Sequence, residues 1–416
     1  MFRILLPSMA ALSLGASTLF ISNKALAQLP LTLPETVTIA LNANDPSVSF
    51  LEQEALAFED LAIADSQLPD PTLRAQITNF PLSSFDYNRE AMTQLKFGIS
   101  QTLPKGQTLS LTRHKRGAQA QGLRAQKALR ERQIALEARQ IWLELYYWQE
   151  ARKLILESQK KVGELGGVAE SVYASGRSSL QDVLRVELET SALGAKLIDI
   201  DRNADIARAN LERLVGRVDG ARPISSVFPV LPRITSEGEI RDKLSRHPSM
   251  RVLDARVETK SRDVDIAAEQ YKPGYSFDAQ YGLRDSRSDL GSIGVSVSLP
   301  LFSKTNKDYA LSAAKRMRSS QKLQRDVQAL DLDRSLRKEW AGYTRLGDRI
   351  TLYENGVLVR AHETSEAAMI AYGNKLADFS ELVRAELAVL DIELTLARLQ
   401  IDRMKAGAYL LYLSGE

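Results

Sequence analysis

The sequence predicts a mixed, mainly α-helical protein built from two structurally equivalent halves, each of which carries one β-hairpin. Three observations predict this architecture. Short motifs recur at separations of 196 to 202 residues, which indicates an internal repeat. Within each half the hydrophobic period changes from two residues, typical of strands, to three or four, typical of helices. The proline-free helical stretches are also longer than a globular domain can cover on its own.

The repeat is clearest in the pattern Gly-x-Ser-x-x-Leu-Pro, which begins at Gly98 and again at Gly294, 196 residues later. A second pattern starts at Tyr173 and returns at Tyr372. Two shorter matches keep the same order: Leu214-Val215-Gly216 with Leu413-Ser414-Gly415, and Asp45-Pro46-Ser47 with His247-Pro248-Ser249. The repeat therefore extends over nearly the whole chain.

Residues 1–27 have the features of an export signal. Arg3 gives a positive start, residues 4–21 are mostly apolar, and Ala25-Leu26-Ala27 forms a small-residue cleavage site. We expect the mature chain to begin at Gln28 and to function beyond the inner membrane. An uncleaved membrane anchor is the alternative, because the apolar stretch approaches the length of a spanning helix.

The composition excludes several classes of protein. Lys and Arg number 55 against 52 Asp and Glu, without the basic patch that nucleic-acid binding requires. The chain has no cysteine, which excludes disulfides, thiolate metal sites and lipid attachment through an N-terminal cysteine. After the signal no apolar run reaches the length of a transmembrane helix, so any membrane crossing would use strands.

Two hairpins are predicted, at about residues 72–104 and 274–301, from alternation of apolar and polar residues. Ser276, Asp278, Gln280 and Arg284 fall on the polar face and are expected to face a lumen. We expect the apolar face to contact lipid through Ile77, Phe97, Tyr275, Phe277, Tyr281, Val295 and Val297. Four strands cannot close a barrel, so several copies would have to contribute. A soluble sheet with one face on a core is the alternative.

The helical stretches on either side of the hairpins carry coiled-coil seams. Ile134, Ile141, Trp148, Ile155 and Val162 fall at intervals of seven, and the returning helices step by three and four. We expect a first repeat at 28–216, with a starting helix at 46–68, a long helix at 106–173 and a returning helix at 179–215. A connector at 217–239 follows, and the second repeat at 240–416 has helices at 248–271, 305–371 and 378–413.

In this order and occurring twice, these motifs resemble the TolC outer-membrane factors of Gram-negative efflux and type I secretion systems. The resemblance implies a homotrimer whose three four-stranded sheets form a twelve-stranded barrel in outer-membrane lipid, continued by a helical tunnel into the periplasm. It also implies a passive exit duct that docks to a periplasmic membrane-fusion adaptor and an inner-membrane pump of the RND type. A periplasmic coiled-coil adaptor or scaffold without a barrel is the alternative function.

The resemblance places functional residues at the two helix-turn-helix tips. The residues of the gate and constriction are implied to be Asp182, Tyr372, Glu381 and Arg384, although the family's latch arginine falls on Ala377. The residues implied to contact the adaptor are Tyr173, Gly176, Ser179, Leu180, Asp182, Val183, Leu184, Tyr372, Phe379, Leu382 and Val383. A solvated, capped helix end is the plainer explanation of Ser179 and Asp182.

No enzymatic site is predicted, and neither a catalytic residue nor a cofactor nor a metal site is expected. His114, His247 and His362 are far apart in the sequence, and none lies in a cluster with metal-ligand spacing. The cargo is not specified by the sequence. The segment 79–85, with Met92, is similar to family members associated with heavy-metal pumps, so heavy-metal or drug efflux is the expected range.

Overall fold

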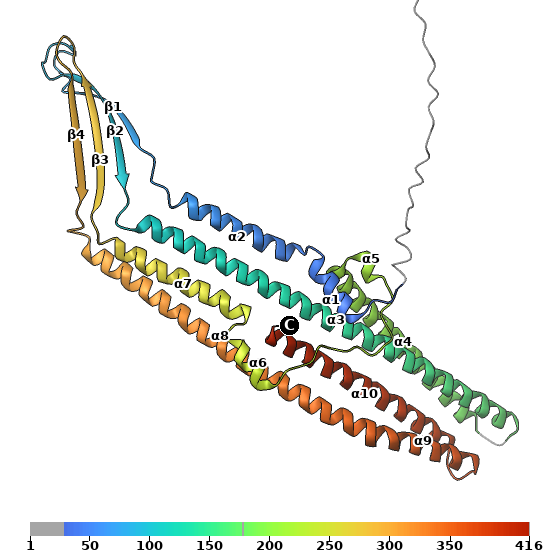
Figure 1. Ribbon diagram of the computed structural model, residues 1–416. Coiled ribbons are helices and arrows are strands. Elements are labelled where there is room, and N and C mark those ends of the chain that lie inside the picture. Colours follow the sequence, from blue (N-terminus) through green and yellow to red (C-terminus); the bar gives the residue numbers. More distant parts are fainter. Residues whose placement is uncertain (1–28, 177–178, 416) are drawn as a thin grey trace, which may run out of the picture.

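The computed structural model describes residues 29–176 and 179–415. The predicted signal peptide and the expected start at Gln28 lie outside the described residues. The molecule is an elongated helical rod with a small sheet at one end and two helical tips at the other (Figure 1). The mainly α-helical class with one four-stranded antiparallel sheet is as predicted.

The first half consists of a short leading helix, three longer helices and two strands. Its elements are α1 Leu33–Asn42, α2 Pro46–Ala64, β1 Thr72–Thr78, β2 Gln94–Leu103, α3 Thr108–Ala174 and α4 Leu180–Val215. The second half and the connector contain α5 Arg217–Gly220, α6 Glu237–Leu244, α7 Pro248–Glu269, β3 Gly274–Leu283, β4 Leu290–Ser298, α8 Lys304–Leu352, the π-helical turn η2 Tyr353–Val357, α9 Leu358–Gly373 and α10 Phe379–Ser414.

Helix α3 is the spine of the rod. It has 67 residues, which corresponds to a length of about 100 Å, and it packs against α2, α7, α4 and α10. The predicted seams lie in its contacts, since Ile134, Ile155 and Val162 are buried. At mid-length Trp142 stacks on Tyr146 and donates a hydrogen bond to the carbonyl oxygen of Leu31 at 3.0 Å. The core therefore runs along the rod instead of forming one globular centre.

The starting helices α2 and α7 use equivalent N-caps of different chemistry. The carboxylate of Asp45 accepts a hydrogen bond from the backbone N–H of Ser47 at 2.7 Å. At the matching position, Nδ1 of His247 accepts from the backbone N–H of Ser249 at 3.3 Å. Each cap satisfies a backbone donor that the first turn of a helix leaves free. His247 is also buried and lies against the ring of Tyr412.

The second long helix contains a π turn. Helical backbone runs from Lys304 to Gly373, close to the expected 305–371, and η2 lies within it between α8 and α9. The π turn contains Asn355 and Gly356, which are poorer helix formers than the residues around them. The separation between matched motifs grows from 196 residues at the strands to 199 at the tips, so the second half accommodates three extra residues within this stretch.

The connector is more ordered than its irregular sequence predicts. It contains α5, and α6 begins at Glu237 within it. Ile224 forms a parallel bridge with Leu31. Arg222 is buried and binds the carboxylates of Glu35 and Asp219 at 2.8 and 3.1 Å. These contacts attach the start of the described chain to the middle of the rod. Helix α1, which lies beside them, is not among the helices expected from the sequence.

Candidate functional site

The sheet at the end of the rod has two unlike faces. Its strands are in the order β1-β2-β3-β4, and all are antiparallel. The register pairs odd-numbered residues with odd-numbered residues, for example Phe97 with Tyr281 and Phe277 with Val295. Directly opposed residues share a face of a sheet, so odd positions form one face and even positions the other.

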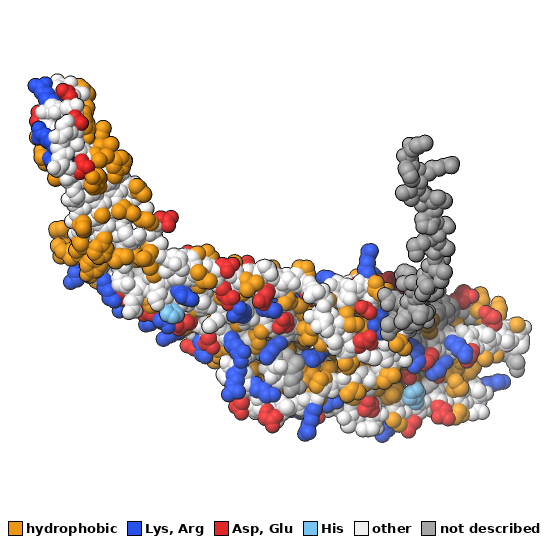
Figure 2. Space-filling view, turned by 45° about the horizontal axis from the view of Figure 1, so that its top comes forward, with side chains coloured by type: hydrophobic (Ala, Val, Ile, Leu, Met, Phe, Trp, Pro, Cys, Tyr) orange, Lys and Arg blue, Asp and Glu red, His pale blue; other side chains and the backbone are white. Residues whose placement is uncertain are grey.

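The odd face is apolar and exposed. All seven residues predicted to contact lipid lie on it, with 43% to 58% of their surface accessible: Ile77, Phe97, Tyr275, Phe277, Tyr281, Val295 and Val297. Leu73 and Ile293 extend it at 78% and 90% exposure. Figure 2 shows hydrophobic side chains gathered along the sheet and where it joins the helices. Soluble monomers rarely expose a continuous apolar area of this kind.

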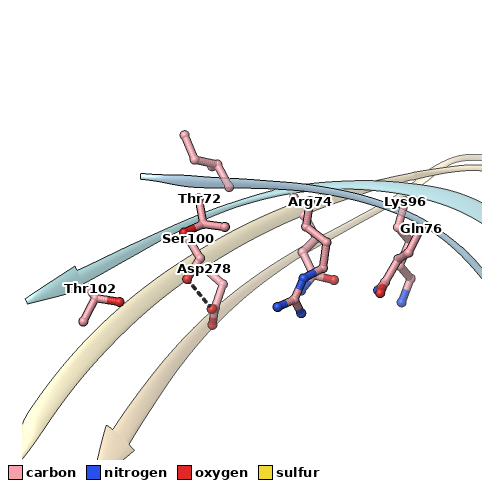
Figure 3. Close-up of a pocket in the computed structure, with 10 residues that line it drawn as sticks. Thr72, Arg74, Gln76, Lys96, Ser100, Thr102 and Asp278 are labelled. Carbon is pink, nitrogen blue, oxygen red and sulfur yellow. Dashed lines mark hydrogen bonds between the residues drawn. The ribbon is translucent and has the colours of Figure 1, made fainter. Parts of the chain in front are cut away.

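The even face is polar and slightly hollowed (Figure 3). Ser276, Asp278 and Gln280 lie on it as predicted. The Ser100 hydroxyl donates to Oδ1 of Asp278 at 3.2 Å and lies 3.1 Å from that of Ser276. Arg284 differs from its prediction, because β3 ends at Leu283 and the Arg284 guanidinium binds the carbonyl oxygen of Ser288 at 2.8 Å. It closes the outer turn and does not line the strand face.

No described residue pairs with either of the two edges of the sheet. Strands β1 and β4 each pair on one side only, which leaves backbone N–H and C=O groups free to bind another strand. The outer loop between β1 and β2 packs Phe80 against Phe85 with ring centroids 6.1 Å apart. Leu82 and Met92 of this loop are exposed.

At the other end of the rod, the two tips pack against each other. Tyr372 and Phe379 of the second tip make ring contact at 5.4 Å, and both join a core cluster with Val183 and Val186 of the first. Burial and the nearby carboxylate of Asp182 raise the pKa of the Tyr372 hydroxyl. Of the predicted gate residues, the structure thus brings Asp182 and Tyr372 together across the tips.

The other two predicted gate residues form a pair of their own. Nη1 of Arg384 lies 2.9 Å from Oε2 of Glu381, and both side chains are exposed. Since they lie three residues apart on one helical face, the positive charge of Arg384 offsets the Glu381 carboxylate. If several copies bring Glu381 together in a ring, each carboxylate is therefore accompanied by the positive charge of Arg384.

The residues predicted to contact an adaptor divide into an exposed and a buried group. Tyr173, Leu180 and Leu184 are 45% to 54% exposed, Gly176 and Ser179 are exposed, and Asp182, Val183 and Tyr372 are half-buried. Phe379, Leu382 and Val383 are 1% or 2% exposed. The side chains of these three residues pack inside the chain, and their contact with an adaptor stays a prediction.

The same repeat positions are exposed on α4 and buried on α10. Leu180 corresponds to Phe379, and Leu184 to Val383. Helix α10 packs between α3 and the helices α8 and α9, whereas α4 packs mainly on α3. Leu180, Leu184 and Leu188 therefore form an exposed apolar stripe one turn apart, each at least half accessible. Leu376, which is 82% exposed at the second tip, is a further apolar surface residue that the motif comparison did not select.

The second tip turns at a residue that strains the backbone. Lys375 has φ of +60°, where its counterpart Gly176 has +71°. The left-handed conformation costs a residue with a side chain about 1–2 kcal/mol. The replacement Lys375→Gly is thus expected to stabilise this tip by about 1 kcal/mol, measured as slower amide hydrogen exchange of residues 370–378.

Gly176→Ala is the matched change at the first tip. A Cβ there would meet no heavy atom within 4 Å, so its cost is conformational only, and faster exchange of the first tip is expected. Unchanged exchange at both tips would contradict the assignment of strain.

The described residues hold no group of three or more His, Asp or Glu side chains suited to a metal ion. His114 is exposed, His362 lies 3.7 Å from Glu393, and His247 is the buried helix cap. Across residues 29–176 and 179–415, none of the helices combines the length and the apolarity needed to cross a membrane.

Comparison with known proteins identifies the fold. No protein-family model matches the chain, and no curated protein does. Among solved structures, the chain is similar to the outer membrane protein VceC of Vibrio cholerae, with 18% identity over 92% of this chain and 96% of that one, at a TM-score of 0.78. The CmeC outer membrane channel of Campylobacter jejuni matches at 11% identity, 98% and 94% coverage and a TM-score of 0.77.

The open state of the MtrE outer membrane channel of Neisseria gonorrhoeae matches at 15% identity, 92% and 89% coverage and a TM-score of 0.73. These likenesses confirm the TolC-like fold that the repeated motifs predict. At such identities they establish the fold alone.

Proposed function

We propose that this protein is the outer-membrane exit duct of a tripartite efflux or secretion system and conducts its cargo passively. The single observation that carries the proposal is the sheet, whose exposed apolar face, opposite polar face and two open edges lie at one end of a helical rod. Lipid favours exposed apolar side chains, but it requires every backbone N–H and C=O group to be paired.

A closed barrel meets both requirements. Four strands are too few to close, but three copies supply twelve, with β4 of one copy pairing with β1 of the next. The odd face would then contact outer-membrane lipid, and the even face would line the lumen. The helices of the three copies would continue the duct into the periplasm, because α2, α3, α7 and α8 all lead away from the sheet.

The tips at the far end are the proposed docking site for a periplasmic membrane-fusion adaptor and, through it, an inner-membrane pump of the RND type. The exposed stripe Leu180, Leu184 and Leu188, together with Tyr173 and Leu376, supplies apolar anchors for such a partner. Asp182 and Tyr372 are proposed to take part in the gate. Heavy-metal ions and drugs are the proposed cargoes, and purification of the protein with its native pump would identify the class.

The proposal is tested by fractionation and by conductance. The protein is expected in the outer-membrane fraction as trimers that dissociate on heating, and purified trimers are expected to open channels in planar lipid bilayers. A freely soluble periplasmic monomer without channel activity would overturn the duct and favour a coiled-coil adaptor, which needs no exposed apolar sheet.

A further inference from the structure

We infer that the lumen formed by the even face of the sheet prefers anions, because Arg74 and Lys96 give it two positive charges per chain and Asp278, its one acid, offsets only one of them. The inference rests on the proposed duct and adds the class of solute that the duct favours. It concerns the wall of the barrel, at the opposite end of the molecule from the gate residues.

The register places the two cations side by side. Arg74 lies opposite Gly98, and Lys96 lies opposite Gln76, so Arg74 and Lys96 are diagonal neighbours on adjacent strands. Figure 3 shows both side chains on the same side of the sheet as Thr72, Gln76 and Asp278. They line one polar hollow of about 260 Å³. Neither forms an ion pair with a described residue. Adjacent like charges on a sheet repel each other, so this pair of cations is unfavourable unless an anion lies near it.

Asp278 is the only acid on the even face of the four strands. Asp278 on β3 pairs with Ser100 on β2, whereas Arg74 on β1 pairs with Gly98, two residues further along β2. Strand β2 therefore lies between Asp278 and Arg74. Its carboxylate accepts a hydrogen bond from Ser100. Each chain therefore contributes two cations and one carboxylate to this face.

A neighbouring copy does not supply the missing acid. If β4 of a second copy pairs with β1, the even face that it brings next to Arg74 contains Ser292, Gly294, Ser296 and Ser298. The three-copy lumen would hold six cations and three carboxylates. The outer loops 79–93 and 284–289 together have three arginines and four acids, a net charge of −1 per chain that lies beyond the strands and not on the even face.

The tips do not reverse this balance. Glu381 is paired with Arg384, and the equivalent acid of the first tip, Asp182, is followed three residues later by Arg185. Rings of like charge set the selectivity of a pore, and low-dielectric walls focus their field. Small carboxylates, phosphates and chloride are thus favoured. Of the proposed cargoes, a heavy-metal ion would pass against this field if it travels as a bare cation.

The test is the reversal potential of full-length trimers in a planar bilayer under a KCl gradient. The wild type is expected to reverse on the chloride side. Its preference should weaken as the mean salt concentration rises, because the Debye length falls from about 10 Å at 0.1 M to about 3 Å at 1 M. The double variant Arg74→Gln, Lys96→Gln leaves one net negative charge per chain on the face and should reverse on the potassium side.

Asp278→Asn is the matched control, since it changes the same face by one charge in the opposite direction and should shift the wild-type potential further toward chloride. It also keeps the test available if the double variant does not insert. Potassium preference in wild-type channels, or a chloride preference that neither variant changes, would overturn this inference alone. The absence of any channel would overturn the proposed duct as well.

Discussion

Phe277→Arg is expected to abolish assembly of the protein in the outer membrane, whereas Ser276→Arg should assemble like the wild type. Phe277 lies on the apolar odd face, paired with Val295 and half exposed. An arginine on the lipid face of a barrel costs up to about 2–4 kcal/mol per copy, and a trimer would incur this cost three times. The measurement is the fraction of heat-dissociable trimer recovered from the outer membrane.

Ser276 is the matched position because it is the adjacent residue on the same strand and points to the polar face. Its hydroxyl lies 3.1 Å from that of Ser100, and loss of one such hydrogen bond costs only about 1 kcal/mol. An arginine there would also lie near the Asp278 carboxylate. If the membrane tolerates arginine equally at both positions, the assignment of the two faces is wrong.

The face of the sheet on which each strand residue lies could be predicted from the sequence, because a period of two residues is a local property. Once Phe97 and Tyr281 alternate with polar neighbours, the face of every other residue on those strands follows. The adjacency of β2 and β3, which joins the two halves into one sheet, is not encoded in either hairpin. It depends on how the long helices bring the hairpins together.

The tips illustrate what a repeat motif cannot predict. Leu184 and Val383 occupy the same repeat position, yet the first is 54% exposed and the second 1%. Their surroundings decide the difference, because α10 packs between other helices and α4 lies at the edge. Motif comparison therefore found the two tips but could not separate surface side chains from those that hold the tips together.

The π turn η2 and the N-cap His247 were missed for a different reason. A π turn and a histidine cap have weak sequence signatures, and both are stabilised by tertiary contacts. The repeat did contain the signal for the cap, since His247-Pro248-Ser249 matches Asp45-Pro46-Ser47. Alignment of the two halves on the shared Pro-Ser pair places His247 at the N-cap position that Asp45 occupies in the first half.

Lowering the pH from 7 to 4 is expected to destabilise the helical rod through His247. Burial, together with the positive charge of Arg132, lowers the pKa of His247 to about 4, against 6.5 in an unfolded chain. The unfolded state therefore binds the proton first as the pH falls, so stability is complete above pH 6.5 and decreases toward pH 4. The loss is about 3 kcal/mol per chain, measured as a lower dissociation temperature of the trimer.

His247→Asn should remove most of this pH dependence. Asparagine caps helices as well as aspartate does, as Asp45 does for α2, and it has no proton to gain in this range. Any packing lost against Tyr412 lowers the stability by the same amount at every pH, so the slope between pH 6.5 and 4 is the diagnostic quantity. His114→Asn, at an exposed position on α3, should keep the wild-type slope. An unchanged slope in His247→Asn would show that other groups, such as buried carboxylates, cause the acid sensitivity.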